Sequence, residues 1–183
     1  MTRYQVVLDI AESVKPRVIA EIGTHQGSTA LGLIEVAKRY HKRPIYWGFD
    51  AFDAVPAYEL PYRDFPNYDI VKARLDATGA EIHLVRGNTR ESLKGVDVRR
   101  LDFVYIDGGH SLETIENDWK WVESQLNDNT VVVFDDYYVG DDTKGCKKLV
   151  DSLKDYNVEI IQPGVTFPQY IVHFVKVERA KYE

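Results

Sequence analysis

The stretch from Val18 to Leu31 restricts the fold of this chain more than any other. It begins as the apolar run Val-Ile-Ala-Glu-Ile and ends in a helical pattern, with Gly23, Gly27 and several small polar residues between them. This order predicts a strand, a tight loop and a helix N-terminus, which is the first half of a βαβ unit. Such a loop presents free backbone N–H groups and the positive end of a helix dipole to a ligand. Taken alone, it also fits a turn that binds nothing.

The rest of the chain continues the alternation of strands and helices. Helical spacing of apolar residues predicts helices over 4–14, 28–40, 67–78, 111–125 and 143–156, with a short one after 87–89. Apolar runs predict strands from 18 and over 45–50, 81–86, 101–107, 130–135, 158–161 and 170–177. We therefore expect one α/β domain over residues 1–183, a doubly wound, mostly parallel seven-stranded sheet of the Rossmann-like type.

Two segments depart from this regular alternation. Residues 162–169 are too few for a crossover between the last two strands, so one edge strand is expected to be antiparallel. Residues 51–68 are rich in prolines and aromatic residues and show no periodicity, which favours a lid or substrate loop over a plain connection.

Composition narrows the classes of protein to consider. The chain has 23 basic and 29 acidic residues, and the net charge of −6 disfavours a broad surface for nucleic acid. The one cysteine, Cys146, excludes an intramolecular disulfide and a cysteine-based metal site. There is no apolar run of membrane-spanning length and no apolar signal-peptide core. We expect a cytoplasmic protein with no membrane partner.

Carboxylates stand where several predicted strands end: Glu21, Asp50, Asp107, Asp135 and Asp136. In an open α/β sheet these ends line one crevice, where ligands bind. A single Asp at such a point is often only a turn or helix cap. Five carboxylates at one edge repel one another, so the pattern predicts a bound positive charge.

The glycine spacing argues against a nicotinamide dinucleotide. A GxGxxG motif that starts at Gly23 needs glycine at positions 25 and 28, where His25 and Ser28 stand. The close approach of the pyrophosphate to the backbone is then disfavoured, and with it an NAD(P) oxidoreductase.

Five segments in order carry a resemblance to a known family. The chain resembles class I S-adenosylmethionine-dependent methyltransferases, and among them the small-molecule O-methyltransferases of the macrocin type. The resemblance extends from Val18 to about Asp151. It rests on the Glu21–Gly27 loop and on the segments GFDAFD (48–53), VRGNTRESL (85–93), DFVYIDGGHS (102–111) and VFDDY (133–137).

The resemblance implies a site for S-adenosylmethionine. Asp50 is expected to bind the ribose hydroxyls, Gly23 and Gly27 to border the methionine part, and Asn88 and Thr89 to lie near adenine, although relatives often carry Asp where this chain has Asn88. The full expected cofactor set is Glu21, Gly23, Thr24, Gly27, Ser28, Asp50, Ala51, Asn88, Thr89 and Asp107.

The chemistry follows from that cofactor. Its sulfonium methyl is already activated, so the protein must align a nucleophile and remove its proton. A divalent cation lowers the pKa of a bound hydroxyl, and carboxylate oxygens are the ligands that Mg²⁺ prefers. We expect Asp107, Asp135 and Asp136 to hold Mg²⁺, as the resemblance implies for its metal-dependent branch. His110, three residues after Asp107, is the candidate base, so both residues are predicted to be catalytic.

Several alternatives stay open from the sequence. The leading hypothesis is an enzyme that transfers a methyl group to a hydroxyl of a small molecule, a sugar or a phenol. A metal-independent methyltransferase with His110 as sole base and a non-catalytic cofactor-binding accessory domain are the alternatives. With the first predicted strand at Val18, the pocket is either open or completed by another subunit of a homo-oligomer. Aromatic residues at 52, 58, 62, 65, 68, 137 and 138 either form a substrate wall or pack their loops.

Overall fold

The computed structural model describes residues 4–54, 66–162 and 164–181, and these form one eight-stranded sheet flanked by helices. The strand order is β3-β2-β1-β4-β5-β8-β6, and β7 pairs with β8 beside this path. The strands are β1 (Val18–Ile22), β2 (Ile45–Asp50), β3 (Glu81–Arg86), β4 (Phe103–Ile106), β5 (Val131–Tyr138), β6 (Tyr156–Ile160), β7 (Val165–Phe167) and β8 (Tyr170–Arg179).

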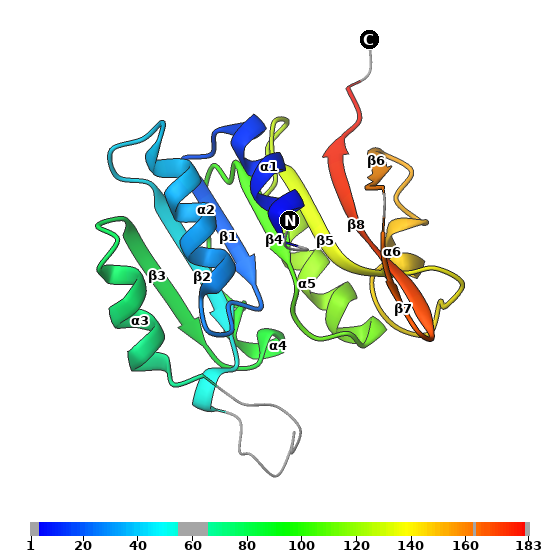
Figure 1. Cartoon of the computed structure of the whole chain (residues 1–183), viewed down its shortest axis with the longest axis horizontal. Coiled ribbons are helices and arrows are strands. Elements are labelled where there is room, and N and C mark those ends of the chain that lie inside the picture. Colours follow the sequence, from blue (N-terminus) through cyan, green and yellow to red (C-terminus); the bar gives the residue numbers. More distant parts are fainter. Residues whose placement is uncertain (1–3, 55–65, 163, 182–183) are drawn as a thin grey trace.

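Strands β1 to β5 run parallel, so their carboxyl ends meet at one edge of the sheet (Figure 1). Strand β8 runs antiparallel to β5, β6 and β7. The α/β class and the mostly parallel sheet predicted from the sequence are confirmed. The antiparallel strand lies one place inside the edge, because β6 pairs along its outer side. The short β7, which the sequence pattern did not indicate, folds back on β8 as a hairpin.

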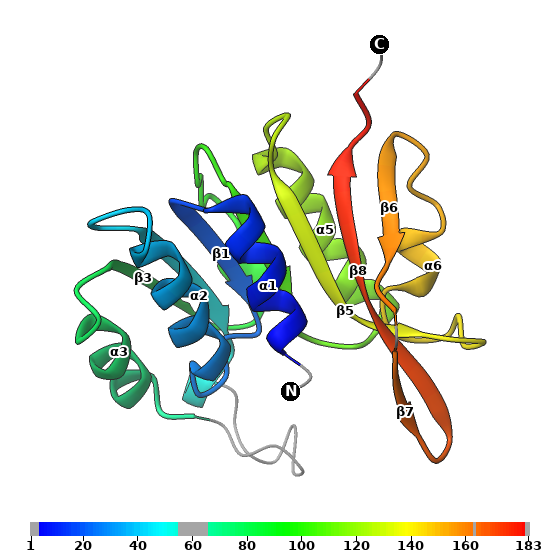
Figure 2. The ribbon, with the colours of Figure 1, turned by 45° about the horizontal axis from the view of Figure 1, so that its top comes forward.

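Helices cover both faces of the sheet (Figure 2). One apolar core lies under α1 (Gln5–Val14), α2 (Ser28–Lys38) and α3 (Tyr68–Asp76), and the other lies under α4 (Thr89–Ser92), α5 (Leu112–Gln125) and α6 (Lys147–Val150). Alternate residues of the central strands enter the two cores. In β4, Phe103 and Tyr105 face the α1–α3 core, whereas Val104 and Ile106 face the α4–α6 core. All five residues of β1 are buried, as expected for the centre of a parallel sheet.

Helix ends follow local chemistry. Asn67 and Ser111 cap α3 and α5, where each side chain accepts a hydrogen bond from a backbone N–H three residues on. Helix α1 ends at Val14, and its C-cap, Lys15, has a left-handed backbone immediately before Pro16.

The predicted helix over 143–156 is wrong in extent, because only α6 (Lys147–Val150) forms there. Gly145 has φ of +68°, and a Cβ built on it would lie 2.1 Å from the carbonyl oxygen of Asp136. The next residue, Cys146, donates its backbone N–H to that same carbonyl (3.1 Å). The segment before α6 is therefore held flat against the end of β5. The spacing of apolar residues in the sequence gives no sign of this tertiary contact.

Most of the predicted lid, residues 55–65 with its aromatic positions 58, 62 and 65, lies outside the described residues. At its borders, Phe52 is fully buried and meets Tyr68 edge to face, with ring centroids 5.4 Å apart. Phe52 and Tyr68 therefore pack the ends of the loop against each other. Packing of the loops is one of the two interpretations given above for the aromatic positions. Among the described helices, none combines the length and apolar character needed to cross a membrane.

Candidate functional site

The carboxyl ends of the parallel strands bring the predicted acidic residues to one region. Glu21, Asp107 and Asp135 belong to three adjacent strands or their ends, in the order β1, β4 and β5. Their odd-numbered positions continue the face of each strand that meets α1 and α2. Asp50 ends β2 on the other side of β1. The order of the strands therefore brings these carboxylates to one edge of the sheet, as predicted.

Glu21 is buried beneath the loop that follows β1 (1% exposed). The hydroxyl of Tyr46, on β2, donates a hydrogen bond to its carboxyl group, and the Thr24 hydroxyl lies 3.3 Å from the same phenol oxygen. Burial raises the pKa of Glu21 to about 8, the Tyr46 hydrogen bond opposes this, and the charges of Asp107 and Asp50 add to it. A cationic group of a ligand above the loop would favour the ionised form.

The loop between β1 and α2 is pressed against the end of β4. Gly23 has φ of +97°, and a Cβ built on it would lie 2.0 Å from the carbonyl oxygen of Asp107. Its backbone N–H donates to the carbonyl of Phe49 (2.8 Å), so three strand ends meet at this residue. Gly27, with φ of +77°, forms the N-cap of α2. The positive φ at both positions therefore explains why glycine stands there.

Asp50 links the ends of β1 and β2. Its Oδ2 accepts a hydrogen bond from the backbone N–H of His25 (2.8 Å), and its Oδ1 accepts one from the backbone N–H of Phe52 (2.9 Å). The carboxylate is half-buried and faces the hollows described next.

Two hollows open along the strand ends. The first, called the Thr24 hollow, has a volume of about 460 Å³. The second, called the Thr89 hollow, has a volume of about 580 Å³. Both are in the size range of ligand pockets. They share Gly23, Asp50 and His110, so they adjoin one another.

Most of the expected cofactor residues line these hollows. Gly23, Thr24, Ser28, Asp50 and Asp107 line the Thr24 hollow. Ala51, Asn88 and Thr89 line the Thr89 hollow together with Gly108, Gly109, Ser111 and Thr114. Glu21 and Gly27 line neither, because Glu21 lies below the loop and Gly27 turns the chain into α2.

Asn88 has a structural partner of its own. It is the N-cap of α4, and its side-chain oxygen accepts the backbone N–H of Arg90 (3.0 Å). Asn88 also lines the Thr89 hollow, and its place near adenine stays a prediction.

Asp107, His110 and Asp136 form the group that fits a metal ion. One ligand atom from each lies within 4.8 Å of the others. His110 Nε2 is 3.0 Å from Asp136 Oδ2. In a six-coordinate Mg²⁺ site with bonds of about 2.1 Å, ligand atoms lie about 3–4 Å apart. Two carboxylates with an imidazole beside them therefore fit a divalent cation after a small contraction.

Asp135 occupies a different position from its neighbour. It is 3% exposed, its Oδ1 accepts the backbone N–H of Asp136 (2.6 Å), and its Oδ2 lies 3.2 Å from the hydroxyl oxygen of Tyr105. The register of β5 against β8 shifts between Phe134 and Tyr137, and Asp136 has φ of +63°. This bulge turns the carboxylates of two consecutive residues toward the same region. Asp135 is not in the three-residue group around His110.

Sequence reasoning missed three tyrosines. Tyr4, at the start of α1, lines the Thr24 hollow with Asp136 and His110. Tyr46 and Tyr105 are fully buried and direct their hydroxyls to the strand-end carboxylates. Burial, followed by the nearby carboxylate charges, raises the pKa of Tyr105 well above its usual value, so the phenol keeps its hydrogen. A tyrosine two residues before Asp107 was the signal available for Tyr105, because such residues share a strand face.

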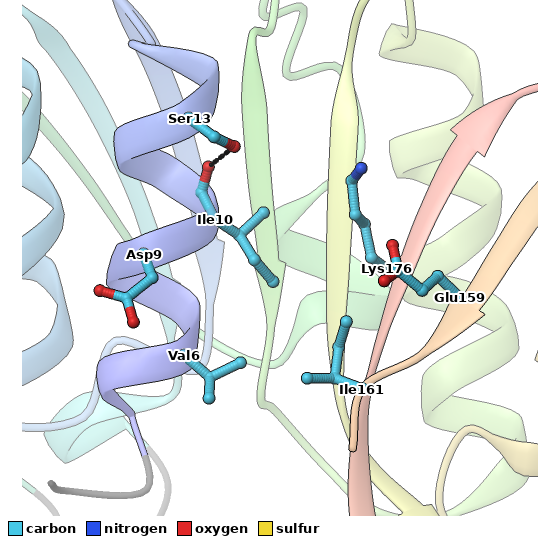
Figure 3. A pocket seen from close by; sticks show the side chains of 7 residues that line it. All are labelled: Val6, Asp9, Ile10, Ser13, Glu159, Ile161 and Lys176. Atoms are coloured by element: carbon cyan, nitrogen blue, oxygen red, sulfur yellow. Dashed lines mark hydrogen bonds between the residues drawn. The ribbon is translucent and has the colours of Figure 1, made fainter. Parts of the chain in front are cut away.

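A third hollow lies between α1 and the antiparallel end of the sheet. In Figure 3 the side chains of Val6 and Ile161 converge there, while Lys176 and Glu159 stand at the far wall. The Ser13 hydroxyl is turned to the Ile10 carbonyl (2.7 Å) and not into the groove. None of the strand-end carboxylates lines this groove, so the candidate site remains at the parallel strand ends.

An open sheet in this order, with a glycine loop and acidic strand ends around adjoining hollows, defines a nucleotide-type binding site of a Rossmann-like protein. Residues 20–137 match the model of a family described as "Methyltransferase domain", which covers more than half of the chain. The chain belongs to this methyltransferase family. The class I resemblance drawn from the motifs is confirmed; the narrower macrocin type stays a prediction. Comparison of the sequence with curated proteins gives no match.

Solved structures share the fold across the chain. One is the O-methyltransferase TomG of Streptomyces achromogenes in complex with SAM, with a TM-score of 0.68 and 15% identity over 99% of this chain and 82% of that one. Another is an O-methyltransferase from Bacillus cereus in complex with SAH, with a TM-score of 0.70 and 11% identity over 98% and 82%. A third is an rRNA methylase from Streptococcus thermophilus, with a TM-score of 0.69 and 13% identity over 99% and 98%.

Proposed function

We propose that this protein transfers the methyl group of S-adenosylmethionine to a hydroxyl of a small molecule with the help of Mg²⁺. One observation carries the proposal: the Asp107–His110–Asp136 group lies beside the glycine loop, and all three residues line the Thr24 hollow with Gly23 and Asp50. A methyl donor held along the two hollows thus has a metal-compatible group and a base next to it.

The cofactor is divided between the two hollows in this proposal. Asp50, shared by both, binds the ribose hydroxyls, since a carboxylate accepts hydrogen bonds from two adjacent hydroxyls. Thr24 and Ser28 lie on the methionine side. Asn88 and Thr89 lie on the adenine side. Glu21 lies buried behind the loop with its pKa raised to about 8, and a cationic group of the bound cofactor would favour its ionised form.

The catalytic step needs an aligned hydroxyl and a place for its proton. Bound Mg²⁺ would lower the pKa of the acceptor hydroxyl. Asp107 and Asp136 would offer carboxylate oxygens to the ion. Asp135, the third predicted acidic residue, accepts the backbone N–H of Asp136 within the bulge. His110 takes the acceptor's proton at Nδ1, because its Nε2 lies 3.0 Å from Asp136 Oδ2 and donates its hydrogen to that carboxylate, which stabilises the imidazolium that results.

A second mechanism has a specific observation in its favour. The 3.0 Å pair between His110 Nε2 and Asp136 Oδ2 resembles a base with its orienting carboxylate, which works without a metal. In that case Asp136 orients the base, and Asp135 supports the bulge of β5.

The acceptor is proposed to be a small molecule, a sugar or a phenol. The net charge of −6 gives little support to binding along a phosphate backbone, although one structural neighbour is an rRNA methylase.

The test is transfer of a labelled methyl group from S-adenosylmethionine to a panel of sugars, phenols and a structured RNA, with Mg²⁺ or with EDTA. Transfer to a small hydroxyl compound that EDTA abolishes is the expected result. Transfer that EDTA leaves unchanged supports the metal-independent mechanism. Transfer to RNA alone contradicts the proposed acceptor class, and no transfer to any acceptor argues for a cofactor-binding accessory domain.

A further inference from the structure

Tyr105 occupies the centre of the acidic edge without reaching solvent. It lies on β4, between β1 and β5, and its side chain is fully buried. Its hydroxyl oxygen is 3.0 Å from Asp107 Oδ2 and 3.2 Å from Asp135 Oδ2. One phenol therefore contacts the carboxylate of Asp107, which follows β4, and the carboxylate of Asp135, which lies within β5.

A phenol has one hydrogen, and here two carboxylates stand within its reach. Both carboxylates therefore accept this single hydrogen in a three-centre hydrogen bond. Such a bridge sets the distance and the relative orientation of its two acceptors. The Tyr105 hydroxyl thereby fixes the Asp107 side chain relative to the end of β5.

The connection continues from Asp135 to Asp136. The second oxygen of Asp135 accepts the backbone N–H of Asp136, in the bulge where Asp136 has a left-handed backbone. A left-handed backbone at a residue that is not glycine must be held by its surroundings. The bulge is held in two places, by Asp135 from within and by Cys146, which donates its backbone N–H to the Asp136 carbonyl (3.1 Å).

The chain of contacts ends at the metal-compatible group. Asp107 stands at one end and Asp136 at the other, and both belong to the group that surrounds His110. Tyr105 and Asp135 connect them, and neither of these two residues lines the Thr24 hollow. Their roles therefore differ from those of the two carboxylates that line the hollow.

We propose that Tyr105 is a positioning residue of the cation site, which aligns Asp107 directly and Asp136 through Asp135. This inference rests on the proposed Mg²⁺-assisted function. It gives Asp135 the task of supporting the bulge from below, while Asp107 and Asp136 face the cation. In metal sites, loss of such supporting hydrogen bonds typically weakens metal affinity about 10- to 100-fold.

The experiment compares wild-type protein with Tyr105→Phe by calorimetric titration with Mg²⁺ alone, and then with S-adenosylhomocysteine. The substitution removes only the hydroxyl and leaves the ring, whose centroid is 6.5 Å from that of Phe174. The expected result is a 10- to 100-fold loss of Mg²⁺ affinity with cofactor-product affinity within about threefold of wild type. Tyr156→Phe is the matched control, since its hydroxyl donates to Glu123 (2.8 Å) away from the site.

Each outcome decides a separate point. Unchanged Mg²⁺ affinity in Tyr105→Phe overturns the positioning role and leaves the proposed function standing. Equal losses of Mg²⁺ and cofactor-product affinity indicate a general structural defect and also overturn it, and thermal unfolding of the variant identifies that case. A wild-type protein that binds S-adenosylhomocysteine but no Mg²⁺ overturns the metal part of the proposed function and this inference with it.

Discussion

Tyr46 donates its hydroxyl hydrogen to the carboxyl group of Glu21, and both side chains are buried on adjacent strands, β2 and β1. Burial raises the pKa of Glu21 to about 8, despite the opposing effect of that hydrogen bond. The native protein therefore holds a proton at neutral pH that the unfolded chain, with an ordinary value of 4.5, has released.

This relationship predicts a pH dependence of stability. Because the folded pKa of Glu21 is raised, its contribution to stability is fully present below pH 4.5 and is lost as the pH rises through 8. Glu21→Gln keeps an acceptor for Tyr46 but cannot titrate. We expect the free energy of urea unfolding to fall more steeply between pH 5 and 8.5 in wild type than in this variant. Equal slopes in the two proteins would contradict the raised pKa.

Gly23 is predicted to be intolerant of a side chain. Gly23→Ala places a Cβ 2.0 Å from the Asp107 carbonyl oxygen, and that atom is backbone. Gly79→Ala is the matched control, because Gly79 also has positive φ (+77°) but nothing within 4 Å of the added Cβ. The control should lose about 1–2 kcal/mol for its backbone conformation. Gly23→Ala should lower the free energy of unfolding by about 1–3 kcal/mol more than the control does, as measured by urea unfolding. Similar losses would show that the β1 loop is not packed against β4.

Asp50 is predicted to support cofactor binding in two ways. Asp50→Ala removes the proposed ribose contact and releases the backbone N–H groups of His25 and Phe52. Hydrogen bonds to a charged group contribute about 1.5–3 kcal/mol, so the affinity for S-adenosylhomocysteine should fall about 10- to 150-fold. Calorimetry measures this loss. Glu159→Gln, in the groove beside α1, should bind as wild type does; a wild-type affinity in Asp50→Ala would remove Asp50 from the site.

Removal of one metal-facing carboxylate should separate cation binding from cofactor binding. Asp136→Asn is expected to weaken Mg²⁺ binding at least tenfold and to leave S-adenosylhomocysteine binding nearly unchanged, because Asp136 belongs to the metal-compatible group and not to the expected cofactor residues. Asp141→Asn, a change in the exposed turn after β5, serves as the control. Retained Mg²⁺ affinity in Asp136→Asn would place the cation elsewhere.

His110 is predicted to act in the transfer step. His110→Ala should reduce turnover about 10²–10⁴-fold, in the range for loss of a general base. The substitution should leave the affinity for Mg²⁺ close to that of wild type if the imidazole serves as a base and not as a ligand. Full turnover in the variant would assign His110 a structural role in its loop.

Much of the fold was predictable because apolar periodicity and acidic strand ends are local features. The bounds of β2 and β3 agree with the predicted ranges, and Glu21, Asp50 and Asp107 lie at adjacent strand ends as expected. The shortened α6 was not predictable, because it depends on the packing of Gly145 against Asp136.

The different surroundings of Asp135 and Asp136 could not be predicted from the sequence either. It depends on a bulge in β5 and on the hydroxyl of Tyr105, which belongs to another strand. Adjacent identical residues give no local signal of which one lines the hollow. The same holds for Tyr4, whose position in the Thr24 hollow follows from the packing of α1 beside the sheet.

Calorimetric titration of the wild-type protein with S-adenosylhomocysteine and, separately, with NAD⁺ tests the central claim most directly. The two ligands share an adenosine but differ at the part that is proposed to lie beside Gly23, Thr24 and Ser28. We expect saturable one-to-one binding of S-adenosylhomocysteine and no binding of NAD⁺. Binding of NAD⁺ in preference, or no binding of S-adenosylhomocysteine, would contradict it.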